Sequence, residues 1–196
     1  MSTTSQSATV SRKESDLGKV FPSGVQIGRT SYGFGVFAFA FIPEGTPIAR
    51  VSGDIIHDPN YSSDYCIDAG EGKVLEPAPP FCYLNHSCEP NCELMVYDAG
   101  EEKGEEKPVE NDCVYGNMGD DDGVLDDAVE EDDEETDKLE SEVWVEAIRD
   151  IMPNEELTID YAWPADRAAK CLCGKPQCRG WIVDPAEREL LPEHVP

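Results

Sequence analysis

The stretch Asn85-His86-Ser87-Cys88-Glu89-Pro90-Asn91 is the densest motif of this chain and decides how the rest is interpreted. Asn85 and His86 form a polar pair directly after the apolar dipeptide Tyr83-Leu84. Taken alone, such a pair indicates either a buried, hydrogen-bonded structural pair or two residues of a binding site. The motifs on either side of this stretch decide between these alternatives.

Two further motifs flank this stretch along the chain. Upstream lies Gly33-Phe34-Gly35, where glycine allows the backbone to approach a ligand closely, although a lone pattern of this kind is more often an ordinary β-turn. Downstream lies Glu156-Leu157-Thr158-Ile159-Asp160-Tyr161. A Cys-x-Cys-x4-Cys tail follows, formed by Cys171, Cys173 and Cys178. Three thiols so close together suit a metal, since structural zinc takes four nitrogen or sulfur ligands; buried free cysteines are the alternative.

Short apolar runs connect these motifs. Residues 20–51, 143–148 and 157–161 contain alternating or β-branched apolar residues, separated by turns that contain glycine and proline. This pattern predicts short strands joined by tight turns rather than helices. The fold is therefore expected to be mainly β.

The charge of the chain is strongly negative. Forty-two acidic residues face fifteen lysines and arginines, which gives a formal net charge of −27. Residues 98–142 hold 21 acidic residues and three lysines, so this segment alone contributes −18. With few apolar residues it cannot offset its ordering entropy, and we expect a solvated insertion. The negative field repels nucleic acid phosphates and attracts basic partners.

No apolar run in the sequence approaches the roughly 20 residues that span a bilayer. The N-terminal residues also lack the charged-then-apolar pattern of a secretion signal. We therefore expect an intracellular protein, nuclear or cytoplasmic, without membrane contact. In such a reducing compartment, clustered cysteines bind metal more often than they form disulfides.

The three motifs, followed by the cysteine tail and Arg179-Gly180, resemble the SET-domain family of protein lysine methyltransferases. The resemblance implies a mainly β, β-clip-like fold of small curved sheets, with a knot-like crossing of the two C-terminal motifs and a zinc-bound post-SET tail. The resemblance and the composition together set the expected domain limits. We expect a disordered leader at 1–19 and a SET domain at 20–164, interrupted by the acidic insertion at about 98–142. A post-SET zinc motif at 165–183 and a tail at 184–196 follow. We expect no cysteine-rich pre-SET region, because the leader contains no cysteine.

The resemblance also implies S-adenosylmethionine as methyl donor and a set of residues that bind it. The cofactor-binding residues are then Gly33, Phe34, Gly35, Tyr65, Asn85, His86, Tyr161 and Leu172. Tyr161 is the catalytic candidate, because a tyrosine hydroxyl can orient the substrate nitrogen and stabilise the migrating methyl group. The resemblance implies that a structural zinc ion is held by Cys88, Cys171, Cys173 and Cys178.

These assignments predict an S-adenosylmethionine-dependent protein-lysine N-methyltransferase. We expect it to act on a histone tail or another basic protein, as a monomer and without direct contact to nucleic acid. Two alternatives stay open: a non-catalytic SET-like binding module with an acidic histone-binding arm, and a zinc-dependent scaffold without cofactor. The intact Asn85-His86 pair and Tyr161 favour the enzyme, and the Gly33-Phe34-Gly35 motif disfavours the scaffold.

Overall fold

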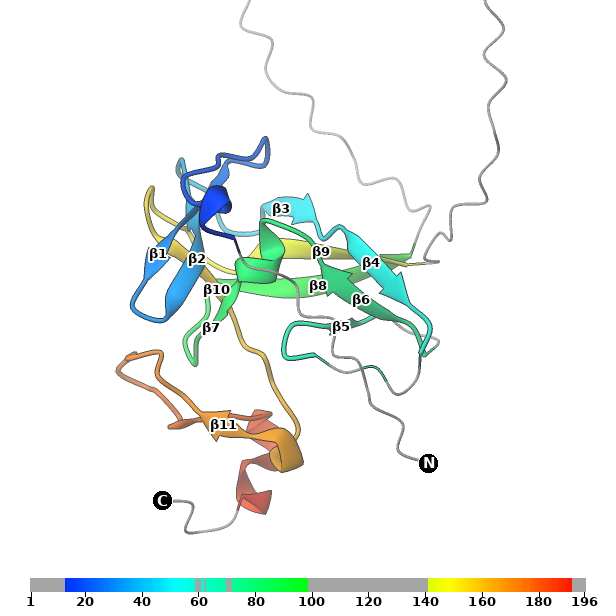
Figure 1. Ribbon diagram of the computed structural model, residues 1–196. Helices are drawn as coiled ribbons and strands as arrows, with labels where there is room; N and C mark the ends of the chain where they lie inside the picture. Colours follow the sequence, from blue (N-terminus) through cyan, green and yellow to red (C-terminus); the bar gives the residue numbers. More distant parts are fainter. Residues whose placement is uncertain (1–12, 59–60, 62, 70–71, 99–140, 192–196) are drawn as a thin grey trace, which may run out of the picture.

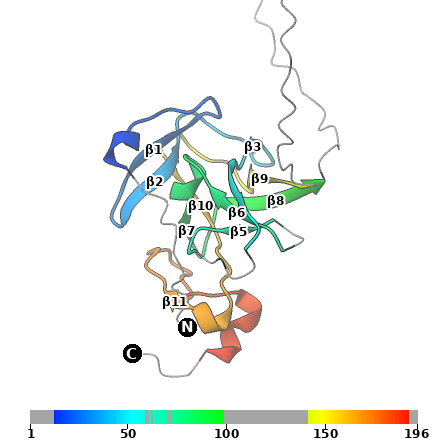
Figure 2. The same ribbon diagram turned by 45° about the vertical axis from the view of Figure 1, so that its right-hand side comes forward.

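The fold is built almost entirely from short strands. The computed structural model describes residues 13–58, 61, 63–69, 72–98 and 141–191, and every structural statement below concerns these residues. Within them, three small sheets pack around an apolar core, a fourth, two-stranded sheet lies in the C-terminal tail, and several short 3-10 helices lie between the strands (Figures 1 and 2). The mainly β fold of small sheets that the sequence predicted is confirmed. No helix in these ranges is both long and apolar enough to cross a bilayer.

The central sheet joins the two motifs that dominate the sequence. It contains, in spatial order, β1 (Val25–Thr30), β2 (Gly33–Ala38), β10 (Glu156–Ile159) and β7 (Asn85–His86). β10 runs antiparallel to β2 but parallel to β7, with Thr158 opposite Asn85 and Ile159 opposite His86. Parallel neighbours need a long connection, because both strands point in the same direction. The chain between β7 and β10 provides that connection, and the two motifs come to lie side by side.

Two further sheets flank the central one. One contains β3 (Pro47–Arg50), β9 (Ser141–Ala147) and β8 (Cys92–Asp98), and the other contains β4 (Gly53–Ile56), β6 (Val74–Pro77) and β5 (Ile67–Asp68). β8 and β9 pair along their whole length and end with Asp98 opposite Ser141 (Figure 1). The expected acidic insertion therefore leaves and returns at neighbouring positions. Residues 99–140 themselves lie outside the described residues.

Alternation along the strands places one face of each in the core. In β9, Val143, Val145 and Ala147 are at most 1% exposed, while the described residues between them are half-buried. Successive side chains of a strand point to opposite faces, so this period of two follows from strand geometry. Each buried valine stabilises the fold by roughly 1.5–3 kcal/mol relative to an exposed one. Leu157 of β10 is also fully buried, which anchors the third motif in the core.

One expectation about the N-terminal segment was wrong. The sequence predicted a disordered leader over residues 1–19, but residues 13–19 are described and include the 3-10 helix η1 (Glu14–Asp16). Asp16 is buried and accepts a hydrogen bond of 2.6 Å from the hydroxyl of Tyr83, a fully buried residue of the 3-10 helix η2 (Phe81–Tyr83). A buried tyrosine hydroxyl needs a polar partner, and this need fixes a segment whose composition suggested disorder. Residues 1–12 lie outside the described residues.

The cysteine-rich tail forms a small lobe of its own. β11 (Ala169–Lys170) pairs with β12 (Trp181–Ile182), and the 3-10 helices η3 (Ala165–Arg167) and η4 (Pro185–Leu190) flank this pair. Both ribbon views place the lobe, coloured orange to red, below β7 and β10. The tail therefore approaches the end of the central sheet at which the two motifs meet.

Candidate active site

Tyr161 and His86 meet where β7 and β10 end. The parallel pairing of these strands sets their rings 5.5 Å apart between centroids. The backbone N–H of Tyr161 donates a hydrogen bond of 3.2 Å to Nδ1 of His86. Because Nδ1 is an acceptor, the ring proton belongs on Nε2, which faces Sγ of Cys88 at 3.4 Å. Burial lowers the pKa of His86 below its ordinary value, so the ring is neutral at pH 7.

Tyr161 also lines a cavity, called the first cavity below. This cavity has a volume of about 220 Å³, and its walls include Tyr65 and Trp163. The Tyr161 hydroxyl donates its hydrogen to the carbonyl oxygen of Leu84 at 2.6 Å. Because a phenol carries a single hydrogen, its oxygen then acts only as an acceptor toward a group in the cavity. The cavity is thus an aromatic-walled pocket with an oriented oxygen at one side.

The second cavity, of about 340 Å³, is lined by Asn85 and His86. From Nδ2, Asn85 donates to the carbonyl oxygen of Phe34 at 2.9 Å and to Oε1 of Glu156 at 2.8 Å. A Cβ at position 35 would lie 2.6 Å from the same Glu156 oxygen and 2.7 Å from Cγ2 of Thr30, so any other residue there would displace these side chains. The glycine motif therefore makes space next to the Asn-His motif, and the Glu156 carboxylate occupies part of that space.

Four of the eight expected cofactor-binding residues line one of these two cavities, whereas Gly33, Phe34, Gly35 and Leu172 line neither. The pair Asn85-His86 lines the second cavity, whereas Tyr65 and Tyr161 line the first. Leu172 is 68% exposed, and its carbonyl accepts a hydrogen bond from the hydroxyl of Tyr32, which lines the second cavity. The tail and the turn between β1 and β2 are therefore joined at that cavity. Tyr32 was not among the expected site residues, and its single sequence signal is its position directly before the glycine motif.

The four expected zinc ligands lie together. The sulfur atoms of Cys88, Cys171, Cys173 and Cys178 are all within 4.8 Å of one another, and those of Cys88 and Cys171 are 3.6 Å apart. Tetrahedral zinc with bonds of about 2.3 Å separates its sulfur ligands by about 3.8 Å, whereas a disulfide needs about 2 Å. Burial favours the thiol of Cys173, but backbone hydrogen bonds from Cys88 and Lys175 favour its thiolate, and the pKa of Cys173 falls to about 7. Burial raises the pKa of Cys88 and Cys171, so these two sulfur atoms need a bound cation to become thiolates. The donor set fits a thiolate-bound metal.

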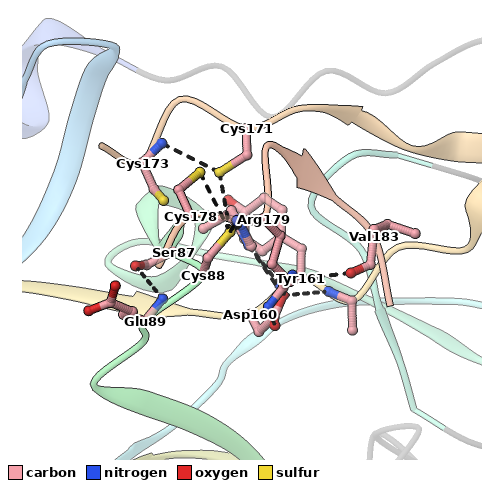
Figure 3. Close-up of polar contacts among 12 residues, drawn as sticks. Ser87, Cys88, Glu89, Asp160, Tyr161, Cys171, Cys173, Cys178, Arg179 and Val183 are labelled. Atoms are coloured by element: carbon pink, nitrogen blue, oxygen red, sulfur yellow. Dashed lines mark hydrogen bonds and ion pairs between the residues drawn. The ribbon is translucent and has the colours of Figure 1, made fainter. Parts of the chain in front are cut away.

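Arg179 connects the cysteine cluster to Asp160, the residue before Tyr161 (Figure 3). Its guanidinium reaches both carboxylate oxygens of Asp160 at 2.7 Å, and its backbone N–H donates to Sγ of Cys88 at 3.4 Å. Asp160 directly precedes Tyr161, and its Oδ1 lies 3.4 Å from Nδ1 of His86. Since the neutral His86 ring carries no charge, Arg179 is the cation that neutralises Asp160. The hydrogen bond to Asp160 correspondingly raises the pKa of Arg179.

Asp160 and Arg179 were not among the expected site residues, although both stand inside motifs. Their sequence signal is their position, since Asp160 precedes Tyr161 and Arg179 follows Cys178. Two opposite charges that each adjoin an expected site residue are candidates for an ion pair. Nineteen residues separate them, so their pairing depends on where the tail docks.

Comparison with known proteins assigns the family. A model of the family described as the SET domain matches residues 33–162. The chain belongs to the SET domain family. The match begins at the glycine motif and ends just after Tyr161, so it contains all three motifs of this SET domain.

Named relatives of this SET chain are histone methyltransferases. "Histone-lysine N-methyltransferase TRX1" of Oryza sativa subsp. japonica is 27% identical over 170 residues, which cover 78% of this chain and 13% of that protein. "Histone-lysine N-methyltransferase, H3 lysine-4 specific" of Schizosaccharomyces pombe is 32% identical over 102 residues, which cover 51% of this chain and 7% of that protein. The chain thus spans a small fraction of the length of either relative.

A solved structure shares the fold. The "crystal structure of KRYPTONITE in complex with mCHH DNA, H3(1-15) peptide and SAH" superposes with a TM-score of 0.52 at 19% identity, and covers 81% of this chain and 29% of that chain. At this identity the likeness concerns the fold. The superposition shows that the strands of this chain are arranged as in that structure.

Proposed function

We propose that this SET chain is an S-adenosylmethionine-dependent protein-lysine N-methyltransferase that acts on a histone or another basic protein. The observation that carries the proposal is the contact between Tyr161, which lines the first cavity, and His86, which lines the second. Two cavities that share a pair of contacting rings suit a transfer between two bound molecules. The names of the relatives, and a solved relative that holds an H3 peptide and SAH, support the choice of lysine and methyl donor.

The substrate lysine enters the first cavity, where Tyr65, Tyr161 and Trp163 provide aromatic walls. Asn85 and His86 hold the methyl donor in the second cavity, which Tyr32 and Leu172 help to border. When bound, S-adenosylmethionine supplies a methyl group that a neutral amine can displace from its sulfonium. The protein contributes the alignment of the two molecules and the exclusion of water, which together account for much of the rate enhancement in such transfers.

Tyr161 orients the amine and stabilises developing charge. Its hydroxyl hydrogen is held by the Leu84 carbonyl, so its oxygen presents lone pairs to the first cavity. An acceptor at this place can take an N–H of the lysine amine and lies near the positive charge that moves with the methyl group. Because the Leu84 contact fixes the hydroxyl before the substrate arrives, little reorganisation is needed during transfer.

The lysine must lose a proton before it can react. With a free pKa near 10.4, deprotonation costs about 4–5 kcal/mol at pH 7. Asp160 lines the first cavity, and an unpaired carboxylate there would stabilise the charged ammonium form. Arg179 offsets this effect by binding both oxygens of Asp160. The tail therefore contributes to the chemistry as well as to the structure.

Cys88, Cys171, Cys173 and Cys178 hold one structural zinc ion. The support is the mutual distance of their sulfur atoms, which suits a tetrahedral site. Four thiolate ligands leave no open position, so the metal has a structural role. Cys88 follows β7 and the other three belong to the tail, so the metal ties the tail to the central sheet.

The domain limits and the surroundings of the protein belong to the same proposal. We assign a SET domain to residues 20–164 with an acidic insertion at about 98–142, a post-SET motif to 165–183 and a tail to 184–196. The negative insertion attracts basic substrates and disfavours nucleic acid. The relatives named as histone methyltransferases favour a nuclear location, and we propose that the chain acts as a monomer.

A non-catalytic binding module with an acidic histone-binding arm is the alternative function. The experiment that separates the two is incubation of the purified chain with labelled S-adenosylmethionine and a panel of histones and total cell protein. Label recovered as methyllysine after hydrolysis supports the enzyme. Tight binding of S-adenosylmethionine without label on any protein supports the module.

A further inference from the structure

Two charged side chains of the second cavity form no ion pair with any residue that the structure describes. The cavity is lined by two cations and two carboxylates, which are Arg29, Lys175, Glu155 and Glu156. Arg29 forms a two-pronged ion pair with Glu14, and Glu155 is paired with an arginine outside the cavity. Within the part of the chain that the structure describes, neither Glu156 nor Lys175 has an ion pair. The cavity therefore offers one unneutralised charge of each sign.

The side of the cavity at Glu156 offers hydrogen-bond acceptors. Both hydrogens of the Asn85 amide are already used, one on the Phe34 carbonyl and one on Oε1 of Glu156. Toward a ligand, Asn85 can then present only Oδ1, and Glu156 only carboxylate oxygens. Such a set suits a primary ammonium group, which carries a positive charge and three donors. A carboxylate or phosphate at this place would meet only acceptors and a like charge.

The side of the cavity at Lys175 offers the opposite chemistry. Lys175 is half-buried in the tail, and its backbone N–H bonds to the sulfur of Cys173. The cysteine cluster thus fixes the backbone that carries this ammonium group. A lysine ammonium is a compact charge with three donors and forms charge-assisted hydrogen bonds with a carboxylate.

We propose that Glu156 and Lys175 together recognise the zwitterionic end of an α-amino acid in the second cavity. Glu156 and Asn85 receive its ammonium group, and Lys175 binds its carboxylate. The inference rests on the proposed function, in which S-adenosylmethionine, a molecule that ends in an α-amino acid, occupies this cavity. It adds a consequence, which is that the tail supplies half of the recognition of the methyl donor.

The test compares two ligands that differ in this end. S-Adenosylhomocysteine carries the amino acid zwitterion, whereas 5′-methylthioadenosine shares its adenosine and thioether but lacks it. Calorimetric titration of the full chain should show that Glu156→Gln and Lys175→Met each weaken S-adenosylhomocysteine about ten-fold or more, since a charge-assisted hydrogen bond is worth at least that much. Both variants should leave the affinity for 5′-methylthioadenosine unchanged. Glutamine keeps an acceptor for Asn85, so the Glu156→Gln variant retains that contact.

The controls separate this effect from charge and folding. The two substitutions change the net charge in opposite directions, yet both should weaken the same ligand, which is neutral overall. Lys170→Met removes the same charge from the same tail outside the cavity lining and should leave both affinities unchanged. Unaltered S-adenosylhomocysteine binding in the Glu156→Gln and Lys175→Met variants, or equal weakening of both ligands, would overturn the zwitterion assignment alone. A wild-type chain that binds neither ligand would overturn the proposed function as well.

Discussion

Replacing Arg179 by methionine tests the link between the cysteine-rich tail and the catalytic centre. Methionine keeps an aliphatic stem of similar reach but removes the guanidinium that binds both oxygens of Asp160 at 2.7 Å. The two side chains are 14% and 24% exposed, so water screens this pair only in part. In the variant, Asp160 stays next to Tyr161 in the lining of the first cavity without a cation.

The main effect should appear in the pH dependence of the rate. A carboxylate within about 4–6 Å of a lysine raises the lysine pKa, by about 1–3 units for a close pair. Because Asp160 is partly exposed, we expect about one unit, which corresponds to about ten-fold less neutral lysine at pH 7. The rate at pH 7 should therefore fall about ten-fold. The loss should shrink as the pH rises toward the new lysine pKa, because the neutral amine is then restored.

The assay is kcat/KM on a basic peptide from neutral to alkaline pH. Arg167→Met is a matched control, because Arg167 lies 3.7 Å from Asp64, a carboxylate that also lines the first cavity. The side chains of Arg167 and Asp64 are, however, 44% and 68% exposed. Solvent already screens that pair, so its loss should not shift the profile. Adding Asp160→Asn to Arg179→Met removes the uncompensated charge and should restore the wild-type profile. A loss of the same factor at every pH, or one that Asp160→Asn does not reverse, would refute the reasoning.

Three further outcomes follow from the structure. The purified chain should carry one zinc ion, and the Cys173→Ser variant should lose both the metal and the activity while the sheets stay folded, since structural zinc contributes roughly 10–16 kcal/mol of binding energy to local order. The control variant Cys66→Ser should keep the metal. Fresh wild-type protein without stoichiometric metal would exclude the site. Burial, and then the hydrogen bond to Asp16, raises the pKa of Tyr83 to about 12. The wild type should therefore lose stability relative to Tyr83→Phe as the pH rises from about 10 toward 12, by about 1.4 kcal/mol per unit, and parallel pH dependences of the two unfolding curves would contradict this. Because Asp98 pairs with Ser141, a short linker can replace residues 101–140. This deletion should spare S-adenosylhomocysteine binding but raise KM for basic peptides. The KM of the deletion variant should also depend less on salt concentration than that of the wild type. An unchanged KM with unchanged salt dependence would mean that this segment has no part in substrate attraction.

The parts of the site that the sequence predicted depend on local chemistry. The Cys-x-Cys-x4-Cys spacing places three thiols within eight residues, so one local turn of the tail can bring them together, and the spacing by itself indicates a metal site. The glycine motif likewise indicates a close approach, and Gly35 does make room for Asn85 and Glu156. The sequential order of the motifs was sufficient to recognise the family, because each motif carries its residues within a few positions.

The parts that it missed depend on contacts between distant segments. The parallel pairing of β7 with β10 decides that Tyr161 faces His86, and nothing in the periodicity of either strand specifies it. Tyr65 was expected to bind the cofactor and lies in the wall of the first cavity. Its place there depends on how β5 packs against β6, which the sequence does not specify. Asp16 looked like part of a disordered leader because its partner, the hydroxyl of Tyr83, is 67 residues away. Each case needs the tertiary fold.

The most direct test of the central claim is methyl transfer by Tyr161→Phe beside the wild type. With labelled S-adenosylmethionine and a basic lysine-containing peptide, the wild type should form methyllysine, and the variant should be about 10²–10³-fold slower, as for the loss of one preorganised polar group. The affinity of both proteins for S-adenosylhomocysteine should be equal, because the Tyr161 hydroxyl lines the first cavity and the methyl donor is assigned to the second. Equal turnover in the two proteins, or a wild type that binds S-adenosylhomocysteine but forms no methyllysine on any lysine-containing substrate, would contradict the account.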